Sequence, residues 1–357
     1  MITRRHITAL GGTLAAATFL GACGEPFTDP SADESPQTSS DQMLTSVVTT
    51  GLQAPWSIAF SGETALVSER DSARILEIAA DGATREVGVI DGVEPGGEGG
   101  LLGLAVHGGQ LFTYLTAADG NRIERRELTG SPGRLGLGDA RTVLEGIPSA
   151  RIHNGGRLAI GPDDMLYATT GDAGDRSSAQ DIESLGGKIL RMAPDGTAPA
   201  DNPFPDSLVY SYGHRNCQGI AWAEDGTMYA SEFGQDTWDE LNLIEAGGNY
   251  GWPDVEGIAE QEGYRDPLQQ WEPAEASPSG IAITGGSLYL ANLRGRRLRV
   301  VPLTDPSTAT ELLVGEYGRL RDVVLAPDGA LWVLTNTTDG RGDPAEEGDR
   351  ILRVAIG

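Results

Sequence analysis

The sequence repeats one short pattern six times, and this repeat constrains the fold more than any other feature. In each copy an apolar segment runs into a turn rich in Gly, Asp or Pro, and a second apolar segment follows, as in a β-hairpin. The copies begin 43 to 63 residues apart and span Ala59–Val67, Ala105–Phe112, Ile160–Tyr167, Ala223–Tyr229, Ile283–Tyr289 and Ala326–Trp332. Hairpins repeated every 40–50 residues or so are typical of propeller blades. We therefore predict an all-β fold, a six-bladed β-propeller of four-stranded antiparallel blades over residues 43–357.

Composition agrees with this prediction. Glycine accounts for 50 of the 357 residues and aromatic residues for only 6%, which favours short strands joined by tight turns over long helices. A β-sandwich with ordinary turns is the alternative, but blade-like spacing argues against it. The net charge of −26 would repel nucleic acid, so we exclude that class of partner. A propeller gathers loops at one end of its channel, where we expect a ligand pocket.

The first 22 residues have the features of an export signal. Arg4 and Arg5 precede an apolar stretch of small residues, and paired arginines are typical of the twin-arginine route. Leu20–Cys23 resembles a bacterial lipobox, so cleavage would leave a lipidated Cys23 at the N-terminus. A plain secretory signal with a chance cysteine is the alternative. We predict an exported lipoprotein anchored on the outer face of the cytoplasmic membrane.

Residues 23–42 are rich in Ser, Pro, Asp and Glu, and we interpret them as a flexible tether between the lipidated Cys23 and the propeller. Cys217 is the only other cysteine. With Cys23 lipidated, an intramolecular disulfide is impossible, and two cysteines are too few for a cysteine-based metal cluster.

Candidate chemistry begins at a glycine-rich segment, residues 151–158, that carries His153. Neighbours without bulk let this histidine approach a ligand closely. Asp172 follows Thr170 and Gly171, and an aspartate can orient an imidazole and favour proton acceptance. A histidine and an aspartate alone are more often structural than catalytic.

Three further segments concentrate polar groups. Residues 210–219 combine an arginine, two amides and a histidine, a set suited to an anionic ligand with carbonyl groups. Residues 231–253 combine a glycine bend with carboxylates, which Ca²⁺ prefers, although the pattern alone is weakly specific. Arg319 and Arg321 lie on one face of an expected strand, because side chains alternate.

Four motifs together resemble one enzyme family. They are His153–Leu158, Gly213–Gly219, Asn249–Pro253 and Arg319–Val323, and they resemble the glucose/sorbosone dehydrogenase family over about residues 47–355. The resemblance implies a six-bladed propeller enzyme that uses pyrroloquinoline quinone (PQQ) and Ca²⁺. It is nearer to the broad aldose dehydrogenases than to the strongly glucose-active branch.

The resemblance also implies roles for individual residues. His153 matches the general base, Asp172 the acid that orients it, and Arg215 the cation at the developing quinone charge. The residues that match the cofactor site are Arg215, Asn216, Gln218, Arg294, Arg319, Arg321 and Trp271. The residues that match Ca²⁺ ligands are Gly234 and Gln235 beside the cofactor, and Asp239, Glu240 and Tyr250 at a second site.

Some positions depart from the family pattern. Arg294 stands where a lysine is frequent, and Gln235 where a proline is usual. Glu98 and Gln180 match substrate positions, but Glu98 replaces a sugar-contacting glutamine, so the preferred sugar stays open.

The implied reaction is oxidation of an aldose at C1 to a lactone. His153 would take the proton of the anomeric hydroxyl, the C1 hydride would move to C5 of the quinone, and an external acceptor would take the electrons. One alternative is a non-catalytic cell-surface propeller that binds a protein or a glycan. Another is a Ca²⁺-dependent propeller hydrolase such as a lactonase, which needs a buried metal ringed by carboxylate and amide side chains.

Overall fold

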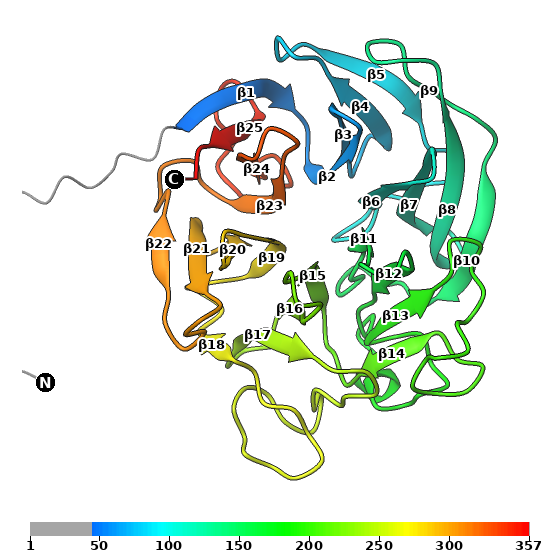
Figure 1. Cartoon of the computed structure of the whole chain (residues 1–357), viewed down its shortest axis with the longest axis vertical. Helices are drawn as coiled ribbons and strands as arrows, with labels where there is room; N and C mark the ends of the chain where they lie inside the picture. Colours follow the sequence, from blue (N-terminus) through cyan, green and yellow to red (C-terminus); the bar gives the residue numbers. More distant parts are fainter. Residues whose placement is uncertain (1–44, 357) are drawn as a thin grey trace, which may run out of the picture. The chain divides into compact units, whose positions relative to one another are not determined.

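The structure is a computed structural model that describes residues 45–356, and these form a closed ring of six antiparallel sheets (Figure 1). Each sheet is one blade. In the first five blades the first strand in the chain lies nearest the centre of the ring, and in the sixth blade the second of the four strands does. The predicted six-bladed propeller is therefore confirmed.

The strands follow one another through the blades in chain order. The first blade consists of β2 (Pro55–Ser61), β3 (Thr64–Glu69), β4 (Arg74–Ile78) and β5 (Thr84–Val89). The second consists of β6 (Leu101–His107), β7 (Gln110–Ala117), β8 (Gly120–Thr129) and β10 (Arg141–Ile147), with the short β9 (Gly136–Leu137) added to β8. The third consists of β11 (Leu158–Ile160), β12 (Leu166–Thr169), β13 (Lys188–Met192) and β14 (Val209–Tyr212).

The remaining blades complete the ring. The fourth consists of β15 (Cys217–Trp222), β16 (Met228–Glu232), β17 (Asp239–Ile244) and β18 (Gln269–Trp271). The fifth consists of β19 (Pro278–Thr284), β20 (Ser287–Asn292), β21 (Arg297–Pro302) and β22 (Thr310–Leu312). The sixth consists of β23 (Leu320–Leu325), β24 (Leu331–Thr335), β25 (Asp349–Val354) and β1 (Thr45–Leu52).

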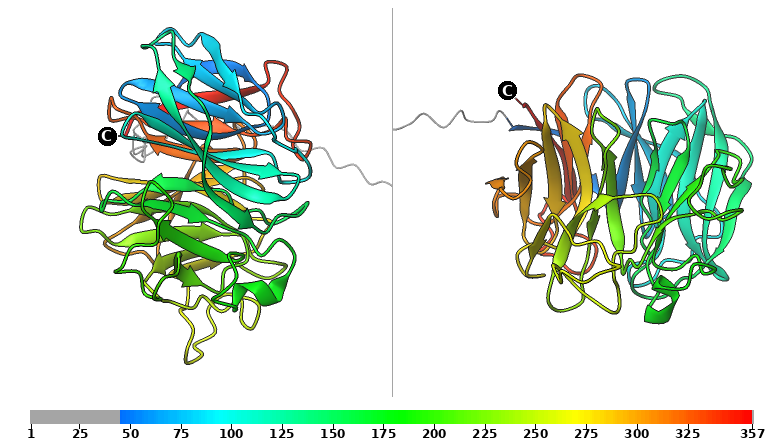
Figure 2. Two further views of the ribbon diagram at one scale, coloured as in Figure 1. Left: turned by 90° about the vertical axis from the view of Figure 1, so that its right-hand side faces the viewer. Right: turned by 60° about the horizontal axis from the view of Figure 1, so that its bottom comes forward.

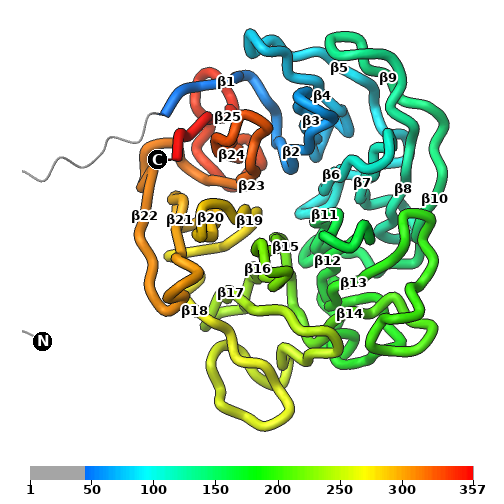
Figure 3. Tube along the Cα trace, viewed as in Figure 1, coloured from blue at the N-terminus to red at the C-terminus, as the bar shows by residue number. Residues whose placement is uncertain are grey.

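The sixth blade joins the two ends of the domain. Its outer strand β1 pairs antiparallel with β25, so Thr45 lies opposite Val354 (Figure 3). The hairpin repeat did not predict this pairing, because β1 precedes the first copy. Strand β1 gives the last blade its fourth strand and holds the first and last segments of the ring together.

Each sequence repeat forms the inner hairpin of one blade. The copy at Ala59–Val67, for example, spans the turn between β2 and β3, and all six residues of β3 are buried. The sheets stand side by side around the ring (Figure 2), and apolar side chains fill the space between them. One core cluster joins Trp56 of the first blade to Phe112 of the second and Leu166 of the third.

The turns of the inner hairpins lie at one end of the ring. Loops that join the second strand of a blade to its third, or one blade to the next, meet at the other end and surround a pocket. One of them, between β12 and β13, carries η1 (Arg176–Ala179), a 3-10 helix and the only helix among residues 45–356.

Within residues 45–356, no helix is both long and apolar enough to cross a membrane. The predicted signal sequence, the lipidated Cys23 and the predicted tether at 23–42 lie outside the described residues.

Candidate active site

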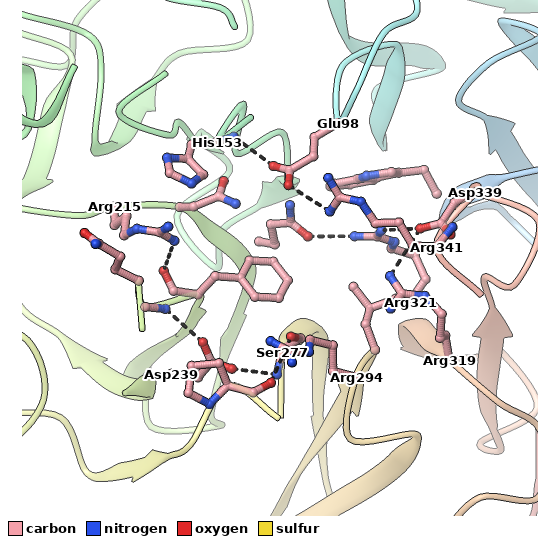
Figure 4. A pocket seen from close by; sticks show the side chains of 18 of the residues that line it. Glu98, His153, Arg215, Asp239, Ser277, Arg294, Arg319, Arg321, Asp339 and Arg341 are labelled. Atoms are coloured by element: carbon pink, nitrogen blue, oxygen red, sulfur yellow. Dashed lines mark hydrogen bonds and ion pairs between the residues drawn. The ribbon is translucent and has the colours of Figure 1, made fainter. Parts of the chain in front are cut away.

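The pocket at the loop end of the channel is a cavity of about 190 Å³ (Figure 4). Most of its charged groups are arginines, namely Arg70, Arg215, Arg294, Arg319, Arg321 and Arg341. Three carboxylates share the wall, and they belong to Glu98, Asp239 and Asp339. Positive charge therefore exceeds negative charge in a space that Trp56 and Phe233 also line.

His153 stands on the wall in an unusual backbone conformation. Its φ of 55° lies in the left-handed region that glycine favours, and such conformations cluster at functional sites. Its backbone N–H donates to Oε2 of Glu98 at 2.8 Å. The adjoining loop needs glycine here, because a Cβ on Gly171 would lie 1.9 Å from the carbonyl oxygen of His153.

Asp172 orients the imidazole from behind. Its Oδ1 lies 2.7 Å from Nδ1 of His153 and accepts the N–H of Gly174, while Oδ2 accepts the indole N–H of Trp252 at 2.8 Å. Burial favours the neutral acid, but these hydrogen bonds outweigh it and hold the pKa of Asp172 below its usual value. An anionic Asp172 assigns the hydrogen to Nδ1 of His153, so Nε2 keeps a lone pair that can accept a proton.

Arg215 lies beside this pair. Its Nη1 donates to the carbonyl of Phe233 at 3.1 Å, and its Nε is buried without a partner among the described residues. Burial lowers the pKa of the Arg215 guanidinium, and the nearby carboxylates of Asp172 and Glu232 oppose that shift. The unpartnered donor is suited to an oxygen of a bound ligand.

Two further arginines, Arg319 and Arg321, lie across the pocket from Arg215 (Figure 4). Arg321 donates to Oε1 of Gln218 at 2.7 Å, and Arg319 pairs with Asp339 at 3.2 Å. Burial, reinforced by Arg319 and other cations nearby, lowers the pKa of Arg321 to about 9. The Nε of Arg321 is a second buried donor without a partner in the described chain.

Asn216 completes this wall of donors. Its Oδ1 accepts the backbone N–H of Gly155 at 3.0 Å, so the amide is fixed while its NH₂ group stays available. Buried guanidinium donors and an excess of positive charge fit an anionic ligand that carries several carboxylates and carbonyls. PQQ has this chemistry.

Gly234, Gln235 and Asp239 form an oxygen-rich part of the wall. No hydrogen bond within residues 45–356 ends on the carbonyl oxygen of Gly234 or Gln235. The carboxylate of Asp239 accepts the N–H groups of Gly234 and Ser277, and burial raises its pKa to about 6. Free carbonyls beside a carboxylate fit a Ca²⁺ ion. No group of three or more His, Cys, Asp or Glu side chains in the described chain could hold a metal by itself.

Most residues predicted for the site line this pocket, and Asp172 lies directly behind it. Apart from Asp172, four predicted residues do not line it, namely Trp271, Gln180, Glu240 and Tyr250. Trp271 lies on the outer strand β18, where the Arg299 guanidinium lies 4.3 Å from its ring centroid. Gln180 uses its amide on Asn249 and on the carbonyl of Trp252.

The other two belong to the packing behind the pocket. Glu240 accepts the N–H of Gly257 and the amide of Asn242. The Tyr250 hydroxyl donates to the carbonyl of Leu243 and accepts the N–H of Glu245.

Several pocket residues escaped the sequence reasoning. Trp252 lay inside the quoted Asn249–Pro253 motif but received no role, although its indole contacts Asp172. Trp56, Asp339 and Arg341 carried no local signal. Arg341 reaches the site from the loop between β24 and β25 and pairs with Glu98 at 2.9 Å (Figure 4).

A second chain of polar side chains resembles a hydrolase triad. Ser211 Oγ lies 2.8 Å from Nε2 of His214, whose Nδ1 lies 2.8 Å from Oε2 of Glu232. The side chain of Ser211 cannot reach a substrate, because both Ser211 and His214 are 0% exposed. The group formed by Ser211, His214 and Glu232 therefore gives no support to the hydrolase alternative.

The family model described as glucose/sorbosone dehydrogenase matches residues 52–352. The chain belongs to this family. The match covers all six blades, and the motifs that predicted it place six residues on the pocket wall, namely His153, Arg215, Asn216, Gln218, Arg319 and Arg321.

Similar proteins agree with this assignment. The PQQ-bound aldose sugar dehydrogenase of Streptomyces coelicolor is 49% identical, with a TM-score of 0.84 over 88% of this chain and 98% of that one. Quinoprotein glucose dehydrogenase B of Acinetobacter calcoaceticus is 31% identical over 61% of this chain and 54% of that protein. Aldose sugar dehydrogenase of Escherichia coli is 31% identical over 57% of this chain and 62% of that protein. The last two matches thus span only about half to three fifths of those proteins.

Proposed function

We propose that this protein is a PQQ-dependent sugar dehydrogenase that oxidises aldoses at C1 to lactones and passes the electrons to an external acceptor. The observation that carries the proposal is the His153–Asp172 pair, which opens on one side into an arginine-lined pocket. Family membership and the similarity to PQQ-bound aldose sugar dehydrogenase support the same activity.

The residues of the chain divide the chemistry between them. Nε2 of His153 accepts the proton of the anomeric hydroxyl, and Asp172 stabilises the imidazolium that forms. PQQ, when bound, supplies the oxidant that takes up the C1 hydride. Arg215 would donate to a quinone oxygen that gains negative charge, while Arg319 and Arg321 would hold carboxylates of the cofactor. Loss of the hydroxyl proton and of the C1 hydride converts C1 into a carbonyl. In the ring form of the sugar, this product is a lactone.

Ca²⁺ belongs to the proposal as the ion that would be held by the carbonyls of Gly234 and Gln235. No group within residues 45–356 donates a hydrogen bond to either carbonyl, and this supports the role. A cation there would add to the positive field of Arg215 and help to fix the cofactor.

Glu98 is the proposed substrate contact. Its carboxylate joins the backbone N–H of His153 to Arg341 (Figure 4), so it lies beside the proposed base. A charged acceptor paired with an arginine differs from a neutral glutamine, so we expect a sugar preference unlike that of enzymes with glutamine here.

The deciding experiment is a reconstitution. The purified protein is mixed with PQQ and Ca²⁺ and assayed for dye reduction with a panel of aldoses, with a chelator-treated sample and a PQQ-free sample as controls. We expect PQQ binding and turnover that depends on both additions. Failure to bind PQQ, or binding without turnover on any sugar, would sink the proposal and favour a non-catalytic propeller.

The proposed location is the outer face of the cytoplasmic membrane, with Cys23 as the lipid attachment site. We expect the protein in the membrane fraction, a mass increase from acyl chains on Cys23, and release of the Cys23→Ser variant from that fraction. An unmodified Cys23 in the mature protein would contradict the anchor.

A further inference from the structure

We propose that Trp252 is a positioning residue that fixes Asp172 and Arg215 relative to each other and thereby keeps His153 in its proton-accepting tautomer. The inference rests on the proposed function, because it assigns a supporting group to the proposed base. Trp252 belongs to the Asn249–Pro253 motif and is 7% exposed.

The first contact is the hydrogen bond from the indole to Asp172. With Oδ2 engaged by Nε1 of Trp252 and Oδ1 engaged by His153 and Gly174, both carboxylate oxygens have partners. Asp172 is 0% exposed, so bulk water does not compete with the indole for Oδ2. The carboxylate therefore cannot rotate away from Nδ1 of His153 without leaving a buried group unsatisfied.

The second contact is the ring itself. The guanidinium of Arg215 lies 5.4 Å from the centroid of the Trp252 ring, and that of Arg176 lies 5.2 Å from it. These distances are within the range of cation–π attraction. One side chain thus touches both the group that orients the base and the cation that faces the cofactor site.

The backbone of Trp252 is also held by hydrogen bonds. Its backbone N–H donates to the carbonyl of Gly213 at 2.9 Å, and its backbone carbonyl accepts the side-chain amide of Gln180 at 2.7 Å. Gln180 also exchanges two hydrogen bonds with Asn249. Gln180 therefore acts as a brace for Trp252, because it links the backbone carbonyl of Trp252 to the side chain of Asn249.

Lys188, the only lysine in the chain, anchors the brace. It is 0% exposed, and its ammonium donates to the carbonyls of Ser178 and Ala179, immediately before Gln180, and to that of Gly186. The end of η1, the brace and Trp252 thus form one connected support.

The expected consequence concerns the tautomer of His153. A neutral imidazole without constraint favours hydrogen on Nε2, which would remove the proposed base. Asp172, held by Trp252, favours hydrogen on Nδ1 instead. The other charged groups near the pair are Arg215 and Glu98, and the guanidinium of Arg176 lies 5.2 Å from the centroid of the Trp252 ring. A substitution of Trp252 leaves all three groups in the chain.

The test is Trp252→Phe, which keeps an aromatic ring and removes the N–H donor. The matched control is Trp332→Phe. The indole N–H of Trp332 is buried without a partner in the described chain, and its ring packs on Phe60, far from the pocket. Nitrogen-15 NMR of the cofactor-free protein reads the tautomer. With only four histidines, the signal of His153 is assigned by its loss in His153→Gln.

In Trp252→Phe we expect an Nε2–H population that the wild-type protein and the control lack. In the reconstituted enzyme we expect kcat about 10- to 100-fold lower with the sugar KM changed less than about twofold, because positioning affects the chemical step. A folded Trp252→Phe protein with a wild-type tautomer or a wild-type kcat overturns the proposal.

Gln180→Met provides a second route if Trp252→Phe does not fold. It loosens the brace, and we expect the same two changes in smaller size; an unchanged tautomer in this variant also overturns the proposal. The NMR measurement needs no turnover. A wild-type protein that oxidises no sugar therefore refutes the proposed function while the positioning of His153 is still decided by the tautomer.

Discussion

Residues 45–356 contain two histidine–carboxylate pairs in which Nδ1 lies at nearly the same distance from the carboxylate. Nδ1 of His153 lies 2.7 Å from Asp172, and Nδ1 of His214 lies 2.8 Å from Glu232. They differ in access, because the His153 side chain is 13% exposed and the His214 side chain 0%. A hydrogen bond to a carboxylate therefore does not make a histidine catalytic; a free second nitrogen facing a ligand space is also required.

The second nitrogen explains the difference between the pairs. Nε2 of His214 is occupied by Ser211, and its ring stacks on Tyr250 at 4.7 Å. The other oxygen of Glu232 accepts the backbone N–H groups of Arg215 and Asn216. The buried His214–Glu232 pair (the sealed pair) thus fixes the segment whose side chains are proposed to bind the cofactor, while the His153–Asp172 pair (the open pair) is the one proposed to react.

The largest effect should come from His153→Gln. Loss of the proposed base should lower kcat/KM about 10²- to 10⁴-fold, with the free energy of unfolding within about 1 kcal/mol of wild type, because the ring is on the pocket wall. Steady-state kinetics and urea unfolding measure the two quantities. Full activity in this variant would remove the distinction between the open and the sealed pair.

His214→Leu should show the reverse. It leaves Oε2 of Glu232 and the hydroxyl of Ser211 buried without their hydrogen-bond partner, at a cost of about 2–5 kcal/mol in the free energy of unfolding. The fraction that stays folded should still turn over sugar. A variant of wild-type stability that has lost all turnover would instead make His214 a catalytic residue.

Acid should act on the open pair through Asp172. Because the folded-state pKa of Asp172 is below its usual value, its contribution to stability is complete above the unfolded value of about 3.9 and is lost as the pH falls through the lower folded value. The stability difference between wild type and Asp172→Asn should therefore shrink only below about pH 4. Thermal unfolding across pH 2–7 measures it, and a difference that shrinks already near pH 6 would contradict a lowered pKa.

The smallest effect should come from Tyr250→Phe behind the sealed pair. The ring that stacks on His214 is kept, and only the hydroxyl bonds to Leu243 and Glu245 are lost, which should cost about 1 kcal/mol. Activity and the Ca²⁺ concentration for half-maximal activity should not change. A higher Ca²⁺ requirement would support the metal role that the family resemblance implies for Tyr250.

The fold was predictable because its signal is local. Each inner hairpin is encoded by a turn and two apolar segments, and six copies indicate six blades whatever lies between them. The closure by β1 was not predictable in this way, because Thr45–Leu52 pairs with a strand about 300 residues away. Nothing in its own residues names that partner.

The candidate site was predictable only in part. The motifs around His153, Arg215 and Arg319 supplied six residues of the wall, because the residues of each motif are close together in the chain. Asp339 and Arg341 reach the pocket from a loop with no motif, and the amide of Gln180, a substrate position by the family resemblance, bonds Asn249 and the carbonyl of Trp252. Side-chain direction in a loop depends on contacts with other loops, which a single sequence does not display.

By itself, the sequence determined the number of blades, the family motifs and the candidate histidines, since all of these are written in short stretches of neighbouring residues. Which histidine is open was decided by the tertiary structure alone. The carboxylate partner lies 19 residues from His153 and 18 residues from His214, so spacing cannot separate the two. Packing between blades covers His214 with Ser211 and Tyr250 and leaves His153 on the pocket wall, because burial is set by residues distant in the chain.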